Sequence, residues 1–329
     1  MSKDHLSAEA LFEHVQDATY FHVPPEVGAL FGAGDEDGQH SSHLNLPQPL
    51  ATPKTDAAGN VLIDHHTHGP VYETIWAPNT GHPVIDDSIL PLDFVFTKFM
   101  AIELAVALIC VLLFGWLASH IRGGRASRGR LSNMLEAFVV FIRDDVAKTA
   151  IGDHGYEKFV PLLCSLFFFV LGCNLFGMLP WMGSPTGVLA TTAALALATF
   201  LAVVTSGVKE LGFAGFLAAQ APSMDLPPPI KVVLLPMIWV IEVFSLFLKH
   251  GVLAVRLLAN MVAGHLILAV LVGFIGAAWT LGLVWWVVMP VSIAGAVAIS
   301  VLELFVAFLQ AYVFTFLSAL FIGAAVHPH

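Results

Sequence analysis

Two apolar runs near the C-terminus constrain the fold of this chain more than any other feature. Residues 230–278 and 283–324 are rich in Leu, Val, Ile, Phe and Ala, and Pro236 is the only proline of the first run. As one helix, residues 230–278 would be about 70 Å long, whereas the hydrocarbon core of a bilayer is about 30 Å thick. Each run therefore forms either two membrane spans or one long, steeply tilted helix.

The composition indicates a membrane protein with a polar N-terminal extension. Hydrophobic residues make up 57% of the 329 residues and charged residues 12%, about half the share in a typical soluble domain. Residues 1–90 contain thirteen acidic residues, with Lys3 and Lys54 as the only basic ones. We predict an acidic, histidine-rich extracytoplasmic extension over residues 1–90 and a membrane domain over residues 91–329.

Histidines and cysteines are the candidate metal ligands of the sequence. His65, His66 and His68 have no carboxylate or cysteine at a fixed spacing, so an exposed polar loop is favoured over a metal site. The cysteines lie in apolar segments without metal-ligand or redox spacing and are interpreted as packing residues: Cys110, Cys164 and Cys173. The sequence therefore predicts no bound metal.

Three shorter apolar segments predict further membrane helices, over residues 96–119, 159–179 and 188–208. The amphipathic stretch 131–152 is too polar to span and is expected to lie at the membrane interface. Four arginines within residues 122–130 follow the first helix, and positively charged loops stay in the cytoplasm. The expected fold is an all-α membrane protein with about five membrane helices, its N-terminus outside and its C-terminus in the cytoplasm.

The first long run carries a stripe of polar residues at spacings of three, four or seven, which place them on one helical face. The stripe comprises Glu242, Ser245, Lys249, Arg256 and Asn260. An arginine at membrane depth costs roughly 2.5–3.5 kcal/mol on insertion scales, which favours a functional role. The alternative is that Arg256 extends its charge to the cytoplasmic interface.

Antiparallel pairing of the two long segments brings further polar residues together. If Arg256 lies opposite Gln310, the same register places His265 close to Glu303. One register thus aligns two polar pairs. We interpret these residues as the lining of a shared path.

The predicted topology divides this path into two routes. Glu242 and Ser245 lie toward the cytoplasm, and the pair formed by His265 and Glu303 lies toward the outside, with Arg256 between them. Two routes that each open to one side and meet at a fixed positive charge describe two half-channels. Titratable histidine and glutamate side chains suit proton relay.

Three motifs, found in this order along residues 90–325, closely resemble those of subunit a of F-type ATP synthases. They are GCNLFGMLP (172–180), LAVRLLANMVAGHLIL (253–268) and LELFVAFLQAYVFTFL (302–317). The resemblance implies that the two long segments are a tilted pair of helices facing a ring of c subunits.

The resemblance also implies residue roles. Arg256 is the stator arginine that pairs with a c-ring carboxylate and separates the half-channels. His265 and Glu303 form the acid–imidazole pair of the outer half-channel, exchanged in position relative to some bacterial members. The other implied proton-path residues are Asn174, Asn260, Gln310 and Glu242, with Ser245 nearby.

The implied function is that of the proton-conducting stator subunit, which couples proton flow to ring rotation and ATP synthesis. The implied partners are the c-subunit ring, b-type peripheral stalk subunits and membrane lipid, with no nucleic acid and no cofactor. The sequence contains no Gly-rich phosphate loop, so the chain alone is not expected to be an ATPase. A bacterial inner membrane is expected ahead of a mitochondrial one, because the N-terminus is acidic, unlike a transit peptide.

The main alternative is an ion-coupled secondary transporter with broken helices. Such a fold predicts repeats in the two halves, and we find none in the sequence. An anchor for haem or quinone would need paired histidines on facing membrane helices, and only His265 is deep in a span.

Overall fold

The computed structural model describes residues 20–22, 43–46, 51–53, 61–62, 72–74, 97–121, 129–153, 155–179, 182–220 and 228–327. The chain divides into two compact units, residues 1–105 with 179–183, and residues 106–178 with 184–329. The proposed boundary between an extension and a membrane domain near residue 90 stays a prediction. His65, His66 and His68 lie outside the described residues.

The first unit contains two antiparallel pairs of three-residue strands. β1 (Tyr20–His22) pairs with β2 (His43–Asn45), and β3 (Ala51–Pro53) pairs with β4 (Tyr72–Thr74). These four are the only strands among the described residues.

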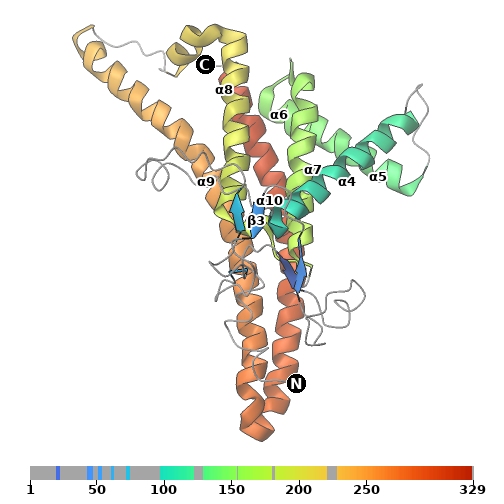
Figure 1. Cartoon of the computed structure of the whole chain (residues 1–329). Helices are drawn as coiled ribbons and strands as arrows, with labels where there is room; N and C mark the ends of the chain where they lie inside the picture. The colour runs from blue at the N-terminus through green and yellow to red at the C-terminus, as the bar shows by residue number, and fades with distance from the viewer. Residues whose placement is uncertain are drawn as a thin grey trace. The chain divides into compact units, whose positions relative to one another are not determined.

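From residue 98 onward, the described chain is helical (Figure 1). The longer helices are α4 (Lys98–Ile121), α5 (Arg130–Phe141), α7 (Val160–Gly177), α8 (Leu189–Ala219), α9 (Pro228–Ala278) and α10 (Trp285–Val326). The shorter segments are η2 (Ile142–Ala147), α6 (Lys148–Ile151), η3 (Tyr156–Phe159), η4 (Pro185–Gly187) and η5 (Trp279–Val284). Five described segments are long and apolar enough to cross a membrane, which confirms the predicted fold class and number of spans.

Helix α8 is longer than the sequence predicts. The predicted helix ends at residue 208, but residues 209–219 are also helical, and the chain changes direction at Gly212 (φ 73°, ψ 163°). Glycine adopts this positive φ without a steric penalty, so the chain turns there and resumes as a helix. The side chain of Phe216 then packs back against Gly207 in the first part of α8.

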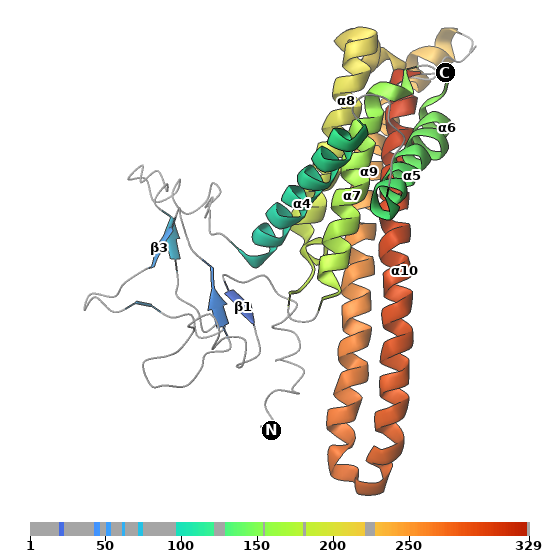
Figure 2. The ribbon, with the colours of Figure 1, turned by 90° about the vertical axis from the view of Figure 1, so that its right-hand side faces the viewer.

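The two long apolar runs each form one continuous helix, which settles the choice between one span and two. Pro236 and Pro290 lie inside α9 and α10, and each removes one backbone hydrogen bond without ending the helix. The helices lie side by side and antiparallel, joined by η5 (Figures 1 and 2). The 51 residues of α9 correspond to about 77 Å, so a steep tilt is expected for a 30 Å core.

The predicted amphipathic stretch corresponds to α5, η2 and α6. Its inner face contributes Leu135, Ile142, Val146 and Ile151, all buried, while Leu131 and Met134 are exposed. η2 and α6 contact α10, and η2 also contacts α7. Its location at the membrane surface stays a prediction.

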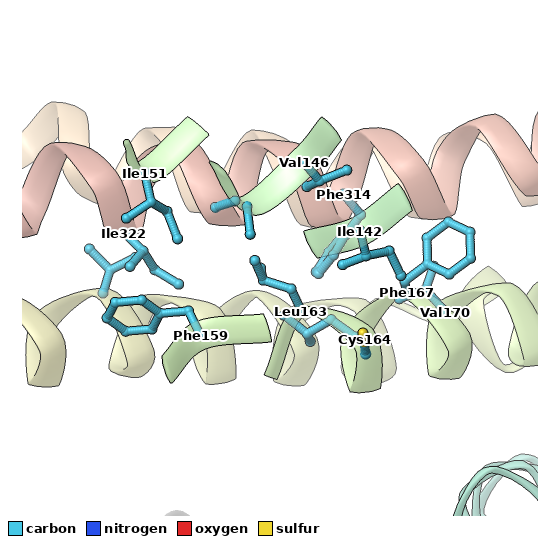
Figure 3. Close-up of a cluster of buried hydrophobic side chains, with 14 of the residues drawn as sticks. Ile142, Val146, Ile151, Phe159, Leu163, Cys164, Phe167, Val170, Phe314 and Ile322 are labelled. Carbon is cyan, nitrogen blue, oxygen red and sulfur yellow. The ribbon is translucent and has the colours of Figure 1, made fainter. Parts of the chain in front are cut away.

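A hydrophobic core lies where η2, α6 and α7 meet the second half of α10. Figure 3 shows Ile142, Leu163, Phe167 and Phe314 pointing toward one another from these elements. In lipid, helices associate mainly through close van der Waals packing, because lipid tails are as apolar as the side chains. This core therefore fixes the second half of α10, which carries polar residues described next.

Candidate functional site

The contact between α9 and α10 contains two polar pairs. The amide of Asn260 on α9 donates from Nδ2 to Oε1 of Gln310 on α10, at 2.7 Å. Nδ1 of His265 lies 3.9 Å from Oε1 of Glu303. The register that pairs His265 with Glu303 is therefore present, whereas Gln310 bonds to Asn260 and not to Arg256.

The His265–Glu303 pair is enclosed between the two helices. The Glu303 side chain is 5% exposed and the His265 side chain 15%. Oε1 of Glu303 and Nε2 of His265 are buried and have no hydrogen-bond partner among the described residues. Buried polar atoms in native structures are nearly always paired, so an acid and an imidazole that face each other without other partners are candidates for proton exchange.

Gly264 makes room for this pair and was not identified from the sequence. A methyl group in place of its hydrogen would overlap Oε1 of Glu303 and lie 2.9 Å from its Cδ. A glycine next to a deep histidine in an apolar helix is a signal for close approach, but the approaching residue is known only from the pairing of the helices.

The Arg256 side chain is exposed on α9, although its helix neighbours Leu253 and Leu257 are buried. No described residue forms an ion pair or a hydrogen bond with its guanidinium. Val252 and Val255 on the same side are also exposed. The guanidinium of Arg256 is thus exposed on the surface of the bundle, where lipid or a neighbouring protein can contact it.

A buried polar chain connects the turn between α7 and α8 to α10. Asn174 donates from Nδ2 to the backbone oxygen of Ala307 at 3.2 Å and accepts a hydrogen bond from Oγ1 of Thr186 at 2.8 Å. The hydroxyls of Ser184 and Thr186 are 2.9 Å apart. Ser184, Thr186 and Asn174 are all buried, and Ala307 lies one helical turn from Glu303.

The hydroxyl groups of this chain were missed in the sequence analysis. The segment GSPTG shows two hydroxyl side chains in a turn, but a turn has no periodicity that would orient them. Only the fold brings Thr186 to the carbonyl oxygen of the Asn174 side chain.

A second polar region lies at the other end of the bundle, between α8, α9 and α10. Oε1 of Glu242 accepts a hydrogen bond from Nζ of Lys249 at 3.0 Å. Both residues line a pocket of about 240 Å³, together with Gln220 and Phe321. Ser245 is half-buried on α9 but does not line this pocket.

His250 is a further buried group that sequence reasoning did not assign. Its Nδ1 lies 2.8 Å from the backbone oxygen of Leu246, and its ring lies between Phe200 of α8 and Phe321 of α10. This imidazole joins three helices beside the pocket. We interpret it as a packing residue that fixes the pocket wall.

The fold and these contacts define a multi-pass helical membrane protein with a polar path between its two longest helices and an outward-facing arginine beside it. The model of the ATP synthase A chain family matches residues 99–323. The chain belongs to this family, which confirms the resemblance drawn from its motifs.

Similar proteins named ATP synthase subunit a occur in several bacteria. That of Chloroherpeton thalassium is 42% identical over 225 residues, 68% of this chain and 64% of the relative. That of Myxococcus xanthus is 42% identical over 242 residues, 72% of this chain and 76% of the relative. For Anaeromyxobacter dehalogenans strain 2CP-1, 42% identity over 200 residues spans 60% of this chain and 50% of the relative. The matched segment thus covers less than two thirds of two of these relatives. The family does not favour the secondary-transporter alternative.

Proposed function

We propose that this chain is the proton-conducting stator subunit of the membrane sector of an F-type ATP synthase. It forms two offset half-channels beside a ring of c subunits and couples proton flow to ring rotation and ATP synthesis. The observation that carries the proposal is one arrangement on α9, with Arg256 facing out of the bundle and His265 facing the buried carboxyl of Glu303. The family assignment supports it.

The outer half-channel leads to His265 and Glu303. An acid and an imidazole at 3.9 Å can exchange a proton after a small side-chain movement. The buried chain from Ser184 through Thr186 and Asn174 points to α10 next to this pair, and it offers a row of hydroxyl and amide groups from the α7–α8 turn inward. The hydrogen-bonded side chains of Asn260 and Gln310 form the last part of this route before Arg256.

The inner half-channel begins at the pocket beside Glu242. Its polar lining residues Gln220, Glu242 and Lys249 can hold water, which an apolar cavity would not. Glu242 is the proton acceptor at this pocket, and Lys249 holds the carboxylate of Glu242 in place by a hydrogen bond. Ser245, one turn further along α9, continues the route toward Arg256.

Arg256 separates the two routes. It is 14 residues beyond Glu242 and 9 before His265, which correspond to about 21 Å and about 14 Å along a helix. A c-subunit carboxylate that reaches Arg256 is stabilised in its ionised form, so it releases its proton there. The fixed positive charge also repels a proton that would pass directly between the half-channels.

The proposal extends to the partners and the orientation. The c ring contacts the exposed side of α9 around Arg256 and supplies the anion that makes this arginine tolerable in a membrane. A b-type peripheral stalk holds the chain against rotation. In the bacterial inner membrane, the N-terminus lies outside and the C-terminus in the cytoplasm, following the arginines of residues 122–130. The nucleotide chemistry belongs to other subunits, so this chain alone is not an enzyme.

The test is ATP synthesis driven by an imposed proton gradient in vesicles that contain the complex with or without this chain. The complete complex should synthesise ATP, and the complex lacking the chain should neither synthesise ATP nor conduct protons. ATP hydrolysis by the detached soluble sector serves as the control and should be unchanged. Undiminished gradient-driven synthesis without the chain would exclude the proposed role.

A further inference from the structure

The end of the α9–α10 hairpin carries a cluster of tryptophans that the proton path does not use. Trp279, Trp285 and Trp286 are three of the seven tryptophans of the chain, and they lie within eight consecutive positions. The rings of Trp279 and Trp285 are 5.2 Å apart, as are those of Trp285 and Trp286, and both pairs are edge-to-face. We call residues 279–287 the tryptophan tip.

The tryptophan tip is formed by a turn that only glycine fits well. Gly282 in η5 has φ 59° and ψ −109°, and this conformation reverses the chain between α9 and α10. Figure 2 shows the hairpin continuing past the ends of α7 and α8, and within the described part of the chain the main contacts of η5 are with α9 and α10. Its side chains are therefore available to whatever surrounds the hairpin.

The exposed surface of the tip is apolar but carries N–H donors. Trp279 is 66% exposed, Trp286 68% and Leu283 86%. Neither exposed indole donates a hydrogen bond to any residue that the structure describes. A large apolar ring with one polar N–H suits the boundary between acyl chains and headgroups, where tryptophan is enriched.

The sequence around the tip excludes a location in bulk water and favours lipid. Between His265 and Glu303, residues 266–302 contain no charged side chain. Phe274, Val291 and Val297, which lie between the tip and the polar pair, are exposed on the hairpin. An apolar helical hairpin that ends in exposed tryptophans has the pattern of a membrane segment that ends at the membrane–water interface.

We propose that the tryptophan tip sits in the headgroup–acyl boundary of the bilayer and anchors the hairpin at a fixed depth. Its occupant is phospholipid, and the exposed indoles donate hydrogen bonds to ester or phosphate oxygens. The anchor sets the depth of the polar pair in the membrane. His265 lies 14 residues before Trp279, and Glu303 lies 18 residues after Trp285. This location follows from the membrane fold and does not depend on the proposed proton path.

The experiment measures fluorescence quenching by brominated phospholipids in vesicles that contain the assembled complex. The emission of Trp279 and Trp286 is obtained as the difference between the wild type and a Trp279→Phe/Trp286→Phe variant. Lipids brominated near the headgroup should quench this component more strongly than lipids brominated near the chain end. The component of Trp239, a half-buried residue that donates a hydrogen bond to the backbone oxygen of Leu217, is obtained with a Trp239→Phe variant for comparison.

Three results of the quenching experiment would overturn the proposal. Stronger quenching by bromine near the chain end would place the tip inside the bilayer. Quenching by aqueous iodide alone would place it in water, and no quenching by any of these agents would mean that a protein partner covers it.

A functional comparison adds a second readout. Replacement of Trp279 and Trp286 by leucine should lower ATP-driven proton pumping, and replacement by tyrosine, which also favours the interface, should retain it. Equal pumping by the leucine and tyrosine variants would contradict the anchoring role.

Discussion

At the scale of single residues, the outer part of the path depends on the space beside Gly264. The carboxyl of Glu303 occupies the volume that any larger residue at position 264 would fill. His265, the next residue, faces the same carboxyl at 3.9 Å. One glycine therefore decides how close acid and imidazole come.

A Gly264→Ala substitution should displace the Glu303 carboxyl and lower ATP-driven proton pumping by about tenfold or more, since misplacing a reacting group by about 1 Å can cost about a hundredfold. Gly273→Ala on the same helix is the matched control, because a methyl group there meets nothing within 4 Å. Pumping rates in vesicles, normalised to assembled complex, measure the difference. Equal rates for the two variants would mean that the close approach at Gly264 has no functional role.

The pair should also tolerate an exchange of its members. His265→Gln and Glu303→Gln should each reduce pumping strongly, because each leaves one titratable group without the other. The double variant His265→Glu/Glu303→His restores an acid facing an imidazole and should pump faster than either single variant. If the exchanged pair is as slow as the single variants, the two residues do not act as a unit.

At the scale of elements, the pairing of α9 with α10 could be predicted from the sequence, and much of the rest could not. Helical spacing places Arg256 and Asn260 on one face, and antiparallel pairing then brings His265 to Glu303, because both follow from the fixed rise of a helix. The sequence left open whether each run was one helix or two. The hydroxyl chain through Thr186 depends on a turn, and the bend at Gly212 depends on one backbone angle, so neither has a periodic signal.

The turn between α7 and α8 is tied to α10 through Asn174. Thr186→Val keeps the side-chain shape but removes the donor to Oδ1 of Asn174, which leaves a buried oxygen unpaired. Interhelical hydrogen bonds in membranes are worth about 0.6–1.7 kcal/mol, so the Tm of the complex should fall by a few degrees. Thr205→Val is the control, because Oγ1 of Thr205 bonds only to the backbone of its own exposed helix face. An unchanged Tm for Thr186→Val would show that the chain of hydroxyls is not a structural link.

At the scale of the whole molecule, charge is distributed by function. Acidic residues are densest in residues 1–90, whereas the membrane helices have few charges, and the charged residues of α9 and α10 other than Lys231 are those of the proposed path. The predicted division at residue 90 rests on this composition alone. The proposed c-ring partner would bring a negative charge to the outward-facing Arg256.

The position of that partner can be tested by disulfide formation. A cysteine at Val252, which is exposed near Arg256, should cross-link to a cysteine placed beside the carboxylate of the c subunit. The neighbouring Leu253 is buried against the bundle, so Leu253→Cys should not cross-link. Cross-links are scored on non-reducing gels of the oxidised complex. Reaction at Leu253 but not at Val252 would place the ring on another face.

The central claim is that Arg256 separates two half-channels. Its most direct test is ATP-driven proton pumping by vesicles that contain the complex with Arg256→Ala, compared with the wild type, with assembly verified by copurification of the other subunits. The account predicts that the variant complex assembles and that pumping is lost. Pumping that persists in the assembled variant would contradict the claim and would reduce Arg256 to a residue that extends its charge to the membrane surface.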